Sequence, residues 1–455
     1  MKKSPTFLFL FFLLALTNCK KESTFQLTVN NQSDSVNEIS LANILLGVDT
    51  TLIASESNVF NLDLELQGPT LIDVTVGNDV FPIYADGGVT TLFSIEASGM
   101  INIPEGDLNN QALKEFSEMS NKIAMTLNPT DYFSEPLERF KIKMDERFQS
   151  LDSFVMAHKS GDVHAYLKNS VAALKSSDAS IYPNYYNYIK KDSIEFPESF
   201  TSNTYGLSLE DENMLLTDAT RTSLTTLAGK MIELHDGITM DEFIKKFIAY
   251  ANENIENPNT RNYLIFKQLL DRINYGGGID GIEEELESLL ANTDNAYYHK
   301  KMNALKAEWA NLRAGQNAPG FNAYDRDGNP VALEDLKGKA VYIDVWATWC
   351  GPCIAEIPSL KSIEKDYHDA DISFVSVSID QQSDEEKWKN FVKEKQLGGL
   401  QLMAENAWQS DIASGYNIKG IPRFILIDKD GKIVRADAPR PSSNEIRNLL
   451  DNYKG

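Results

Sequence analysis

Two cysteines three residues apart, Cys350 and Cys353, are the residues whose spacing best suits chemistry, namely thiol-disulfide exchange. An apolar run typical of a buried strand precedes them, and a helical pattern begins at the second cysteine. Free N–H groups and the positive end of the dipole at a helix N-terminus lower the pKa of a thiol. We therefore expect Cys350 to be the attacking thiolate.

Cys353 is expected to complete the exchange. It lies one helical turn later, where it can attack the Sγ atom of Cys350 in a mixed disulfide and release the reduced client thiol. The chain has only one other cysteine, Cys19, so a framework of structural disulfides is not available. The Cys350–Cys353 disulfide is thus the expected redox group, and no other cofactor is predicted.

Other chemistries fit this pair less well. Zinc would need two further ligands, and the histidines show no ligand spacing, so no metal site is predicted. A peroxiredoxin would carry Thr or Ser three residues before its reactive cysteine, where this chain has Ala347. Haem attachment would require His directly after Cys353, where Ile354 stands. The five histidines are His158, His164, His235, His299 and His368.

The elements around the cysteines alternate between strand and helix from a Gly- and Pro-containing boundary near residues 313–321 to the C-terminus. A turn at Asp428–Gly431 predicts a hairpin, and Ser442–Glu445 predicts a capping box for the last helix. The predicted strands are Val341–Val345, Ile372–Val377 and Phe424–Asp428, and the predicted helices are 353–367 and 384–396.

Two further regions precede this α/β unit. Short segments with period-two alternation predict a small antiparallel β region. Helical spacing then runs from about residue 108 to 311, interrupted by Pro183, Pro197, Pro258 and the loop Tyr275–Ile279. The predicted β segments are Phe25–Val29, Asn58–Leu66, Thr70–Val76 and Thr91–Glu96. A chain of 455 residues also exceeds one hydrophobic core, so several domains are expected.

The first residues predict export. Lys2 and Lys3 are followed by the apolar run Phe7–Leu16, as in a secretory signal peptide. The ending Leu-Thr-Asn-Cys19 resembles a bacterial lipobox, in which Cys19 would carry lipid; an ordinary signal peptide containing a cysteine is the alternative. The net charge of −23, from 43 basic and 66 acidic residues, argues against a nucleic-acid partner.

From about Gly315 onward, the sequence resembles the TlpA/ResA-like family of exported, thioredoxin-fold thiol-disulfide oxidoreductases. The resemblance covers roughly the last third of the chain and implies a C-terminal α/β thioredoxin fold there. It rests on Ala318–Phe321, Leu336–Lys339, Trp349–Cys353, Pro358 and Gly420–Phe424 in this order. Because a β region and an α-helical region precede it, a multidomain protein is expected. The antiparallel β region loosely resembles the β-sandwich-like module that many exported thioredoxin-fold lipoproteins carry ahead of a helical spacer. The expected division is 1–18 signal peptide, 19–105 β-rich domain, 106–312 α-helical domain and 313–455 thioredoxin-like domain.

The family also implies roles for residues around the cysteines. A cis peptide is expected before Pro422, with the Ile421 backbone free to pair with an extended client, and Trp349, Gly351 and Pro352 complete the client-binding surface. Asp344 lies where thioredoxins carry a buried acid, and Glu356 lies where ResA-like members carry an acid. Either carboxyl could accept the proton of Cys353; a polar strand end and a solvated helix residue are the alternatives.

These features together predict a lipid-anchored enzyme of the bacterial cell envelope, facing the periplasm. Gly351-Pro352 resembles the dipeptide of reducing thioredoxins, so reduction of client proteins with disulfides is expected, with electrons from a membrane electron-donor protein. The alternative is a substrate-binding or chaperone lipoprotein in which residues 25–310 capture a client and the redox domain is an accessory.

Overall fold

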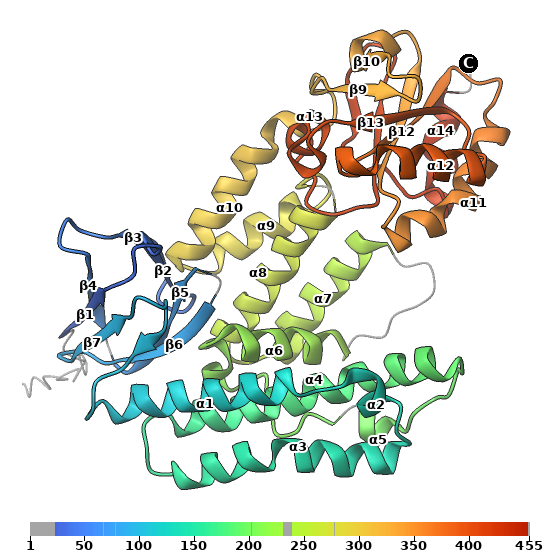
Figure 1. The fold of residues 1–455 in the computed structure, drawn as a ribbon. Coiled ribbons are helices and arrows are strands. Elements are labelled where there is room, and N and C mark those ends of the chain that lie inside the picture. Colours follow the sequence, from blue (N-terminus) through green and yellow to red (C-terminus); the bar gives the residue numbers. More distant parts are fainter. Residues whose placement is uncertain are drawn as a thin grey trace, which may run out of the picture. The chain divides into compact units, whose positions relative to one another are not determined.

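The computed structural model describes residues 23–66, 68–77, 79–201, 203–230, 239–276 and 278–453. The predicted signal segment and Cys19 lie outside these described residues. The chain forms two compact units (Figure 1). The first contains Val48–Gly206 together with the described residues up to Ile44 and Leu216–Arg221, and the second contains Leu45–Gly47, Leu207–Leu215 and the chain from Thr222.

The first unit begins with two four-stranded sheets of order β4-β1-β7-β8 and β3-β2-β5-β6. Alternate residues of β1, including Phe25 and Val29, share one buried core with Ile39 and Ile72 of the other sheet, so the two sheets form a sandwich. The strands are β1 Ser23–Asn31, β2 Glu38–Asn43, β3 Val48–Ile53, β4 Val59–Leu66, β5 Thr70–Val76, β6 Asp79–Ala85, β7 Thr90–Ile95 and β8 Ile101–Asn102.

One pairing differs from the antiparallel prediction. β1 pairs antiparallel with β4 but parallel with β7, where Gln26 lies opposite Thr90. The chain passes through the second sheet between β1 and β7, which allows it to return in the same direction. Side-chain alternation has the same period in both kinds of pairing, so the pattern alone cannot tell them apart.

Helices complete the first unit, and their core is rich in aromatic side chains. The rings of Phe140 and Tyr182 stack with their centroids 4.1 Å apart. Pro183 was expected to break the helical region but lies inside α4, because the neighbouring Tyr182 and Ala179 are buried in this core and hold the helix together. The helices are α1 Leu108–Met125, α2 Pro129–Phe133, α3 Leu137–Ala157, α4 His164–Lys190 and α5 Glu198–Thr201.

In the second unit, four helices follow η1 (Glu212–Leu215) and α6 (Asp218–Lys230), of which the part from Thr222 belongs to this unit. The Gly-rich loop ends α8 as predicted. A Cβ atom on Gly278, whose φ is +90°, would lie 2.2 Å from the Trp309 ring, so only glycine fits there. The elements are α7 Met240–Asn254, α8 Pro258–Tyr275, α9 Glu283–Ala291, α10 Ala296–Trp309 and η2 Ala310–Leu312.

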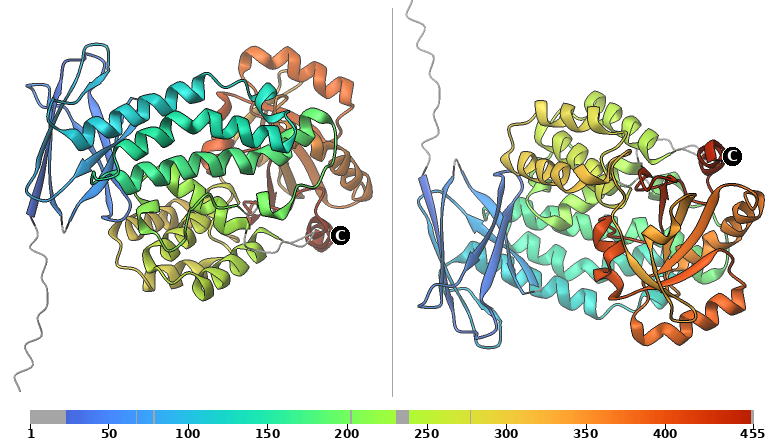
Figure 2. Two further views of the ribbon diagram at one scale, coloured as in Figure 1. Left: turned by 90° about the horizontal axis from the view of Figure 1, so that it is seen from below. Right: turned by 90° about the horizontal axis from the view of Figure 1, so that it is seen from above.

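The rest of the second unit is a thioredoxin fold, as expected, around a seven-stranded sheet of order β10-β9-β13-β12-β11-β14-β15 (Figure 2). All seven residues of the central strand β11 are buried. Residues of α11 and α14 share a core with one sheet face. The strands are β9 Asn322–Asp325, β10 Pro330–Ala332, β11 Ala340–Trp346, β12 Ile372–Ser378, β13 Leu400–Ala404, β14 Arg423–Ile427 and β15 Ile433–Arg435.

The helices of this fold include α11, which carries the cysteine motif. They are η3 Leu333–Leu336, α11 Gly351–Asp366, η4 Gln382–Asp384, α12 Glu385–Lys395, η5 Ala407–Gln409, α13 Asp411–Gly415, α14 Asn444–Leu450 and η6 Asp451–Tyr453. Among the residues that the structure describes, none of the helices has the length and apolar character needed to cross a membrane.

Candidate active site

Sheet register brings two segments to the same edge of the thioredoxin sheet. They are the cysteine turn, Trp349–Cys353, and the proline loop, the segment that leads to Pro422. β11 and β12 are parallel, with Trp346 opposite Ser378, and Ser378 in turn lies opposite Met403 of β13. β14 runs the other way and places Arg423 opposite Val345. The carboxyl ends of the three parallel strands therefore meet the start of β14, where Pro422 stands.

Cys350 and Cys353 form a disulfide at this edge, with Cα atoms 5.3 Å apart. Cys350 is the N-cap of α11, and its Sγ atom accepts a hydrogen bond of 3.2 Å from the backbone N–H of Cys353. The N–H groups of the first turn therefore face the sulfur that would carry the negative charge. The two residues are only 4% and 5% exposed, whereas Trp349 is 52% exposed. The exposed Trp349 ring therefore forms part of the accessible surface beside the disulfide.

A buried carboxylate that was missed in the sequence holds the turn before Cys350. Asp380, fully buried after the end of β12, accepts hydrogen bonds from the Thr348 backbone N–H at 2.9 Å and the Thr348 hydroxyl at 2.8 Å. The Ser378 hydroxyl donates a third bond of 2.7 Å. An acidic residue three positions after a predicted strand, at the carboxyl end of a parallel sheet, was the available signal.

Asp344 lies on the sheet face that α11 covers. It is opposite Phe424 in the ladder, and Phe424 packs with Leu360 and Ile363 of α11. Burial and, next, the negative charge of Glu356 raise the pKa of Asp344 to about 8. A carboxyl with this pKa can change its protonation state near neutral pH.

Glu356 is buried on the same helix, one turn after Cys353. Its two carboxylate oxygens accept bonds from the Ser442 backbone N–H at 2.9 Å and the Ser442 hydroxyl at 2.8 Å. The prediction of a capping box starting at Ser442 is therefore wrong, because this serine is engaged with Glu356 and Ser443 is the N-cap of α14. Glu356 is not a solvated helix residue.

The peptide bond between Ile421 and Pro422 is cis, as expected. Both residues are partly exposed, so the loop is accessible beside the disulfide edge. Within the described residues, no group of three or more His, Cys, Asp or Glu side chains could hold a metal ion. The arrangement supplies a dithiol, a buried carboxyl and an open backbone edge.

The raised pKa of Asp344 predicts how stability changes with pH. Between about pH 4 and pH 8 the folded protein keeps a proton that the unfolded chain releases, so stability falls as pH rises, by up to about 1.4 kcal/mol per pH unit. Asp344→Asn lacks this titration, so its free energy of unfolding relative to wild type should grow across the window.

All five tryptophans belong to the second unit, so tryptophan fluorescence during denaturation of the oxidised protein measures this effect. Asp327→Asn, which changes an exposed carboxylate, is the matched control. Parallel curves for wild type and Asp344→Asn from pH 4 to pH 8 would contradict the prediction.

Comparison with known proteins agrees with this geometry. The Redoxin family model matches residues 313–450. The thiol-disulfide oxidoreductase ResA of Bacillus cereus is 33% identical over 144 residues, 32% of this chain and 80% of the relative. ResA of Bacillus subtilis is 29% identical, covering 33% and 82%.

A solved structure of a candidate thiol-disulfide oxidoreductase from Bacteroides vulgatus is 42% identical and covers 32% of this chain and 99% of that chain, with a TM-score of 0.29. The match to the Bacillus cereus protein extends over most of that relative at substantial identity. This chain is therefore a member of the TlpA/ResA-like family of thioredoxin-fold thiol-disulfide oxidoreductases.

Proposed function

We propose that this protein reduces disulfides of client proteins, with Cys350 as the nucleophile and Cys353 as the resolving thiol. The observation that supports these roles best is the N-cap position of Cys350, where its sulfur accepts the Cys353 N–H at 3.2 Å. This position favours the thiolate of the first cysteine. The second cysteine follows within the first turn of α11.

The proposed reaction has two balanced steps. The Cys350 thiolate attacks one sulfur of the client disulfide, so that a mixed disulfide forms and one client thiolate leaves. Cys353 then loses its proton, attacks the Sγ atom of Cys350 and expels the second client thiolate. The client gains two electrons, and the enzyme is left with the Cys350–Cys353 disulfide.

Asp344 is our proposed acceptor for the Cys353 proton. Its pKa of about 8 suits exchange with a thiol, whose ordinary pKa is about 8.5. Glu356 has both oxygens engaged by Ser442, and its negative charge contributes to the raised pKa of Asp344. We therefore assign Glu356 to tuning Asp344 and not to receiving the proton.

The client is proposed to lie as an extended segment across the proline loop. The Ile421 backbone would pair with it, while Pro422, Gly351, Pro352 and Trp349 form the surface around the disulfide. All five residues are at least partly exposed, in contrast to the cysteines they surround.

We further propose export, lipidation of Cys19 and attachment to a membrane of the cell envelope, facing the periplasm. The four-part division at residues 18/19, 105/106 and 312/313 belongs to this proposal. A membrane electron-donor protein would reduce the Cys350–Cys353 disulfide after each turnover. The support is the sequence of residues 1–19 and membership of a family whose exported members act in this way.

Substituting the two cysteines should have different effects. Cys350→Ser should abolish exchange, because the attacking thiolate is lost, whereas Cys353→Ala should attack and then stop at the mixed disulfide. Non-reducing gels and mass spectrometry with a disulfide-bonded client measure the trapped adduct. Equal amounts of adduct on the two variants would contradict the assigned roles.

The reduction potential tests the direction of the reaction. Thioredoxin lies near −270 mV and the strong oxidant DsbA near −120 mV, a difference of about five orders of magnitude in equilibrium constant. We expect the full chain to lie below about −180 mV, the potential of protein disulfide isomerase. Titration against glutathione buffers, read by alkylation of free thiols, provides the value. A more oxidising potential would overturn the assignment as a reductase.

Lipidation of Cys19 can be measured directly. Mass spectrometry of the N-terminal peptide from envelope fractions should show a diacylated cysteine, and Cys19→Ala should lose membrane attachment while keeping exchange activity. An unmodified Cys19 in the mature protein would refute the proposed anchor.

A further inference from the structure

Helices outside the thioredoxin fold contact the segment that leads to Pro422. The Lys419 ammonium donates to the Asn274 side-chain oxygen of α8 at 3.1 Å and lies 3.3 Å from a carboxylate oxygen of Glu308 on α10. The Asn417 side chain donates to the Glu308 backbone carbonyl at 3.2 Å. The ends of α8 and α10 are thus attached to the proline loop by three polar contacts.

Tyr275, the last residue of α8, places an aromatic ring at this loop. Its Cδ1 atom lies 3.6 Å from the point where a Cβ atom on Gly420 would be, two positions before Pro422. The residue is 65% exposed, although its position is fixed by the end of the helix. The Gly276 N–H donates to the Arg272 carbonyl at 2.8 Å, and the Gly278 N–H donates to the Ile273 carbonyl at 3.1 Å.

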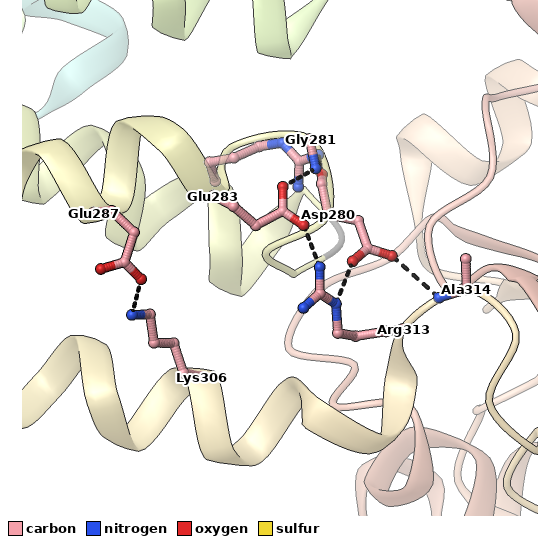
Figure 3. Close-up of polar contacts among 8 residues, drawn as sticks. Asp280, Gly281, Glu283, Glu287, Lys306, Arg313 and Ala314 are labelled. Carbon is pink, nitrogen blue, oxygen red and sulfur yellow. Dashed lines mark hydrogen bonds and ion pairs between the residues drawn. The ribbon is translucent and has the colours of Figure 1, made fainter.

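A second attachment holds these helices to the thioredoxin fold (Figure 3). Arg313, at the junction between α10 and the fold, contacts Asp280 at 3.0 Å and also Glu283, and the Ala314 N–H donates to Asp280 at 3.2 Å. A pocket of 390 Å³ lies nearby, between α9 and α10. Its two basic side chains, Lys306 and Arg313, are paired with acidic residues. We therefore assign this region to positioning and not to a ligand.

We propose that Tyr275 is a specificity residue that binds an aromatic or large aliphatic side chain of the client close to its reacting cysteine. This inference rests on the proposed function and adds the class of client. A client strand paired with Ile421 advances about 3.3 Å per residue, so a side chain one or two residues from the paired position can reach the ring beside Gly420.

The other exposed rings near the disulfide favour the same kind of client. Trp349 and Trp408 lie with their ring centroids 6.4 Å apart and are 52% and 37% exposed. The backbone just before Trp408 is unusual, because Asn406 and Ala407 both have positive φ angles, 62° and 49°. This conformation is unfavourable for alanine. An apolar client side chain that contacts these rings is removed from water, whereas a polar one gains little.

The test compares peptides carrying one cysteine in a mixed disulfide with cysteamine. Each peptide carries either Phe or Ser at one position near the cysteine and is otherwise the same. One pair of peptides has this position before the cysteine, and a second pair has it after the cysteine. The second-order rate constant for oxidation of the pre-reduced full chain is followed by alkylation and mass spectrometry. Wild type should react faster with the more reactive of the two Phe peptides than with the matching Ser peptide. Tyr275→Ala should lower the rate constant for that Phe peptide about fivefold to tenfold. The Ser peptides should be little affected.

Controls separate this inference from the proposed function. Tyr275→Phe should keep the preference, because the ring remains, and Tyr188→Ala, which removes a tyrosine that is 81% exposed on α4, should match wild type. Wild type with no activity on any disulfide, including that of cystamine, would defeat the proposed function itself. An active wild type without preference, or a Tyr275→Ala variant slowed equally on every peptide and on cystamine, would overturn the specificity role alone.

Discussion

The structure of the active site depends on one interaction, the contact between the Cys350 sulfur and the N-terminus of α11. The sulfur accepts the Cys353 N–H only because β11 delivers the chain to the start of that helix at the sheet edge. Complete burial of β11 fixes the strand, and Asp380 fixes the turn through two bonds to Thr348. A thiolate therefore meets N–H groups that are already oriented, so little reorganisation accompanies its formation.

Two buried carboxyl groups, Asp344 on β11 and Glu356 on α11, add a second constraint. Two like charges in a buried site cannot both form easily, so the environment must assign the charge to one of them. Ser442 supplies two hydrogen bonds to Glu356, while the pKa of Asp344 is raised to about 8. The bonds from Ser442 to Glu356 of α11 support Asp344 as our proposed acceptor for the Cys353 proton. An acid of this kind reduces stability at neutral pH in return for reactivity.

The sequence predicted the features that depend on local order. The spacing of Cys350 and Cys353 and the apolar strand before them were available from contiguous residues, and the cis bond at Pro422 was implied by the family resemblance. Asp380 and Ser442 were missed as site residues because only tertiary structure brings them to Thr348 and Glu356. Tyr275 was missed because helix packing, and not sequence spacing, places it beside Gly420. The parallel pairing of β1 with β7 and the continuation of α4 through Pro183 likewise depend on tertiary contacts, which override local pattern.

The Tyr275 ring of α8, beside the proline loop, gives the helices of the second unit a role in function that is separate from the role of the thioredoxin fold. The dithiol chemistry requires only the sheet edge and α11, which any thioredoxin fold supplies. Choice among clients requires contacts away from the sulfur, because every disulfide presents the same reacting atoms. The Tyr275 ring lies beside Gly420, and Lys419 ties the loop to Asn274 and Glu308. Replacing the helices around an unchanged thioredoxin fold would therefore alter client preference and leave the exchange chemistry itself intact.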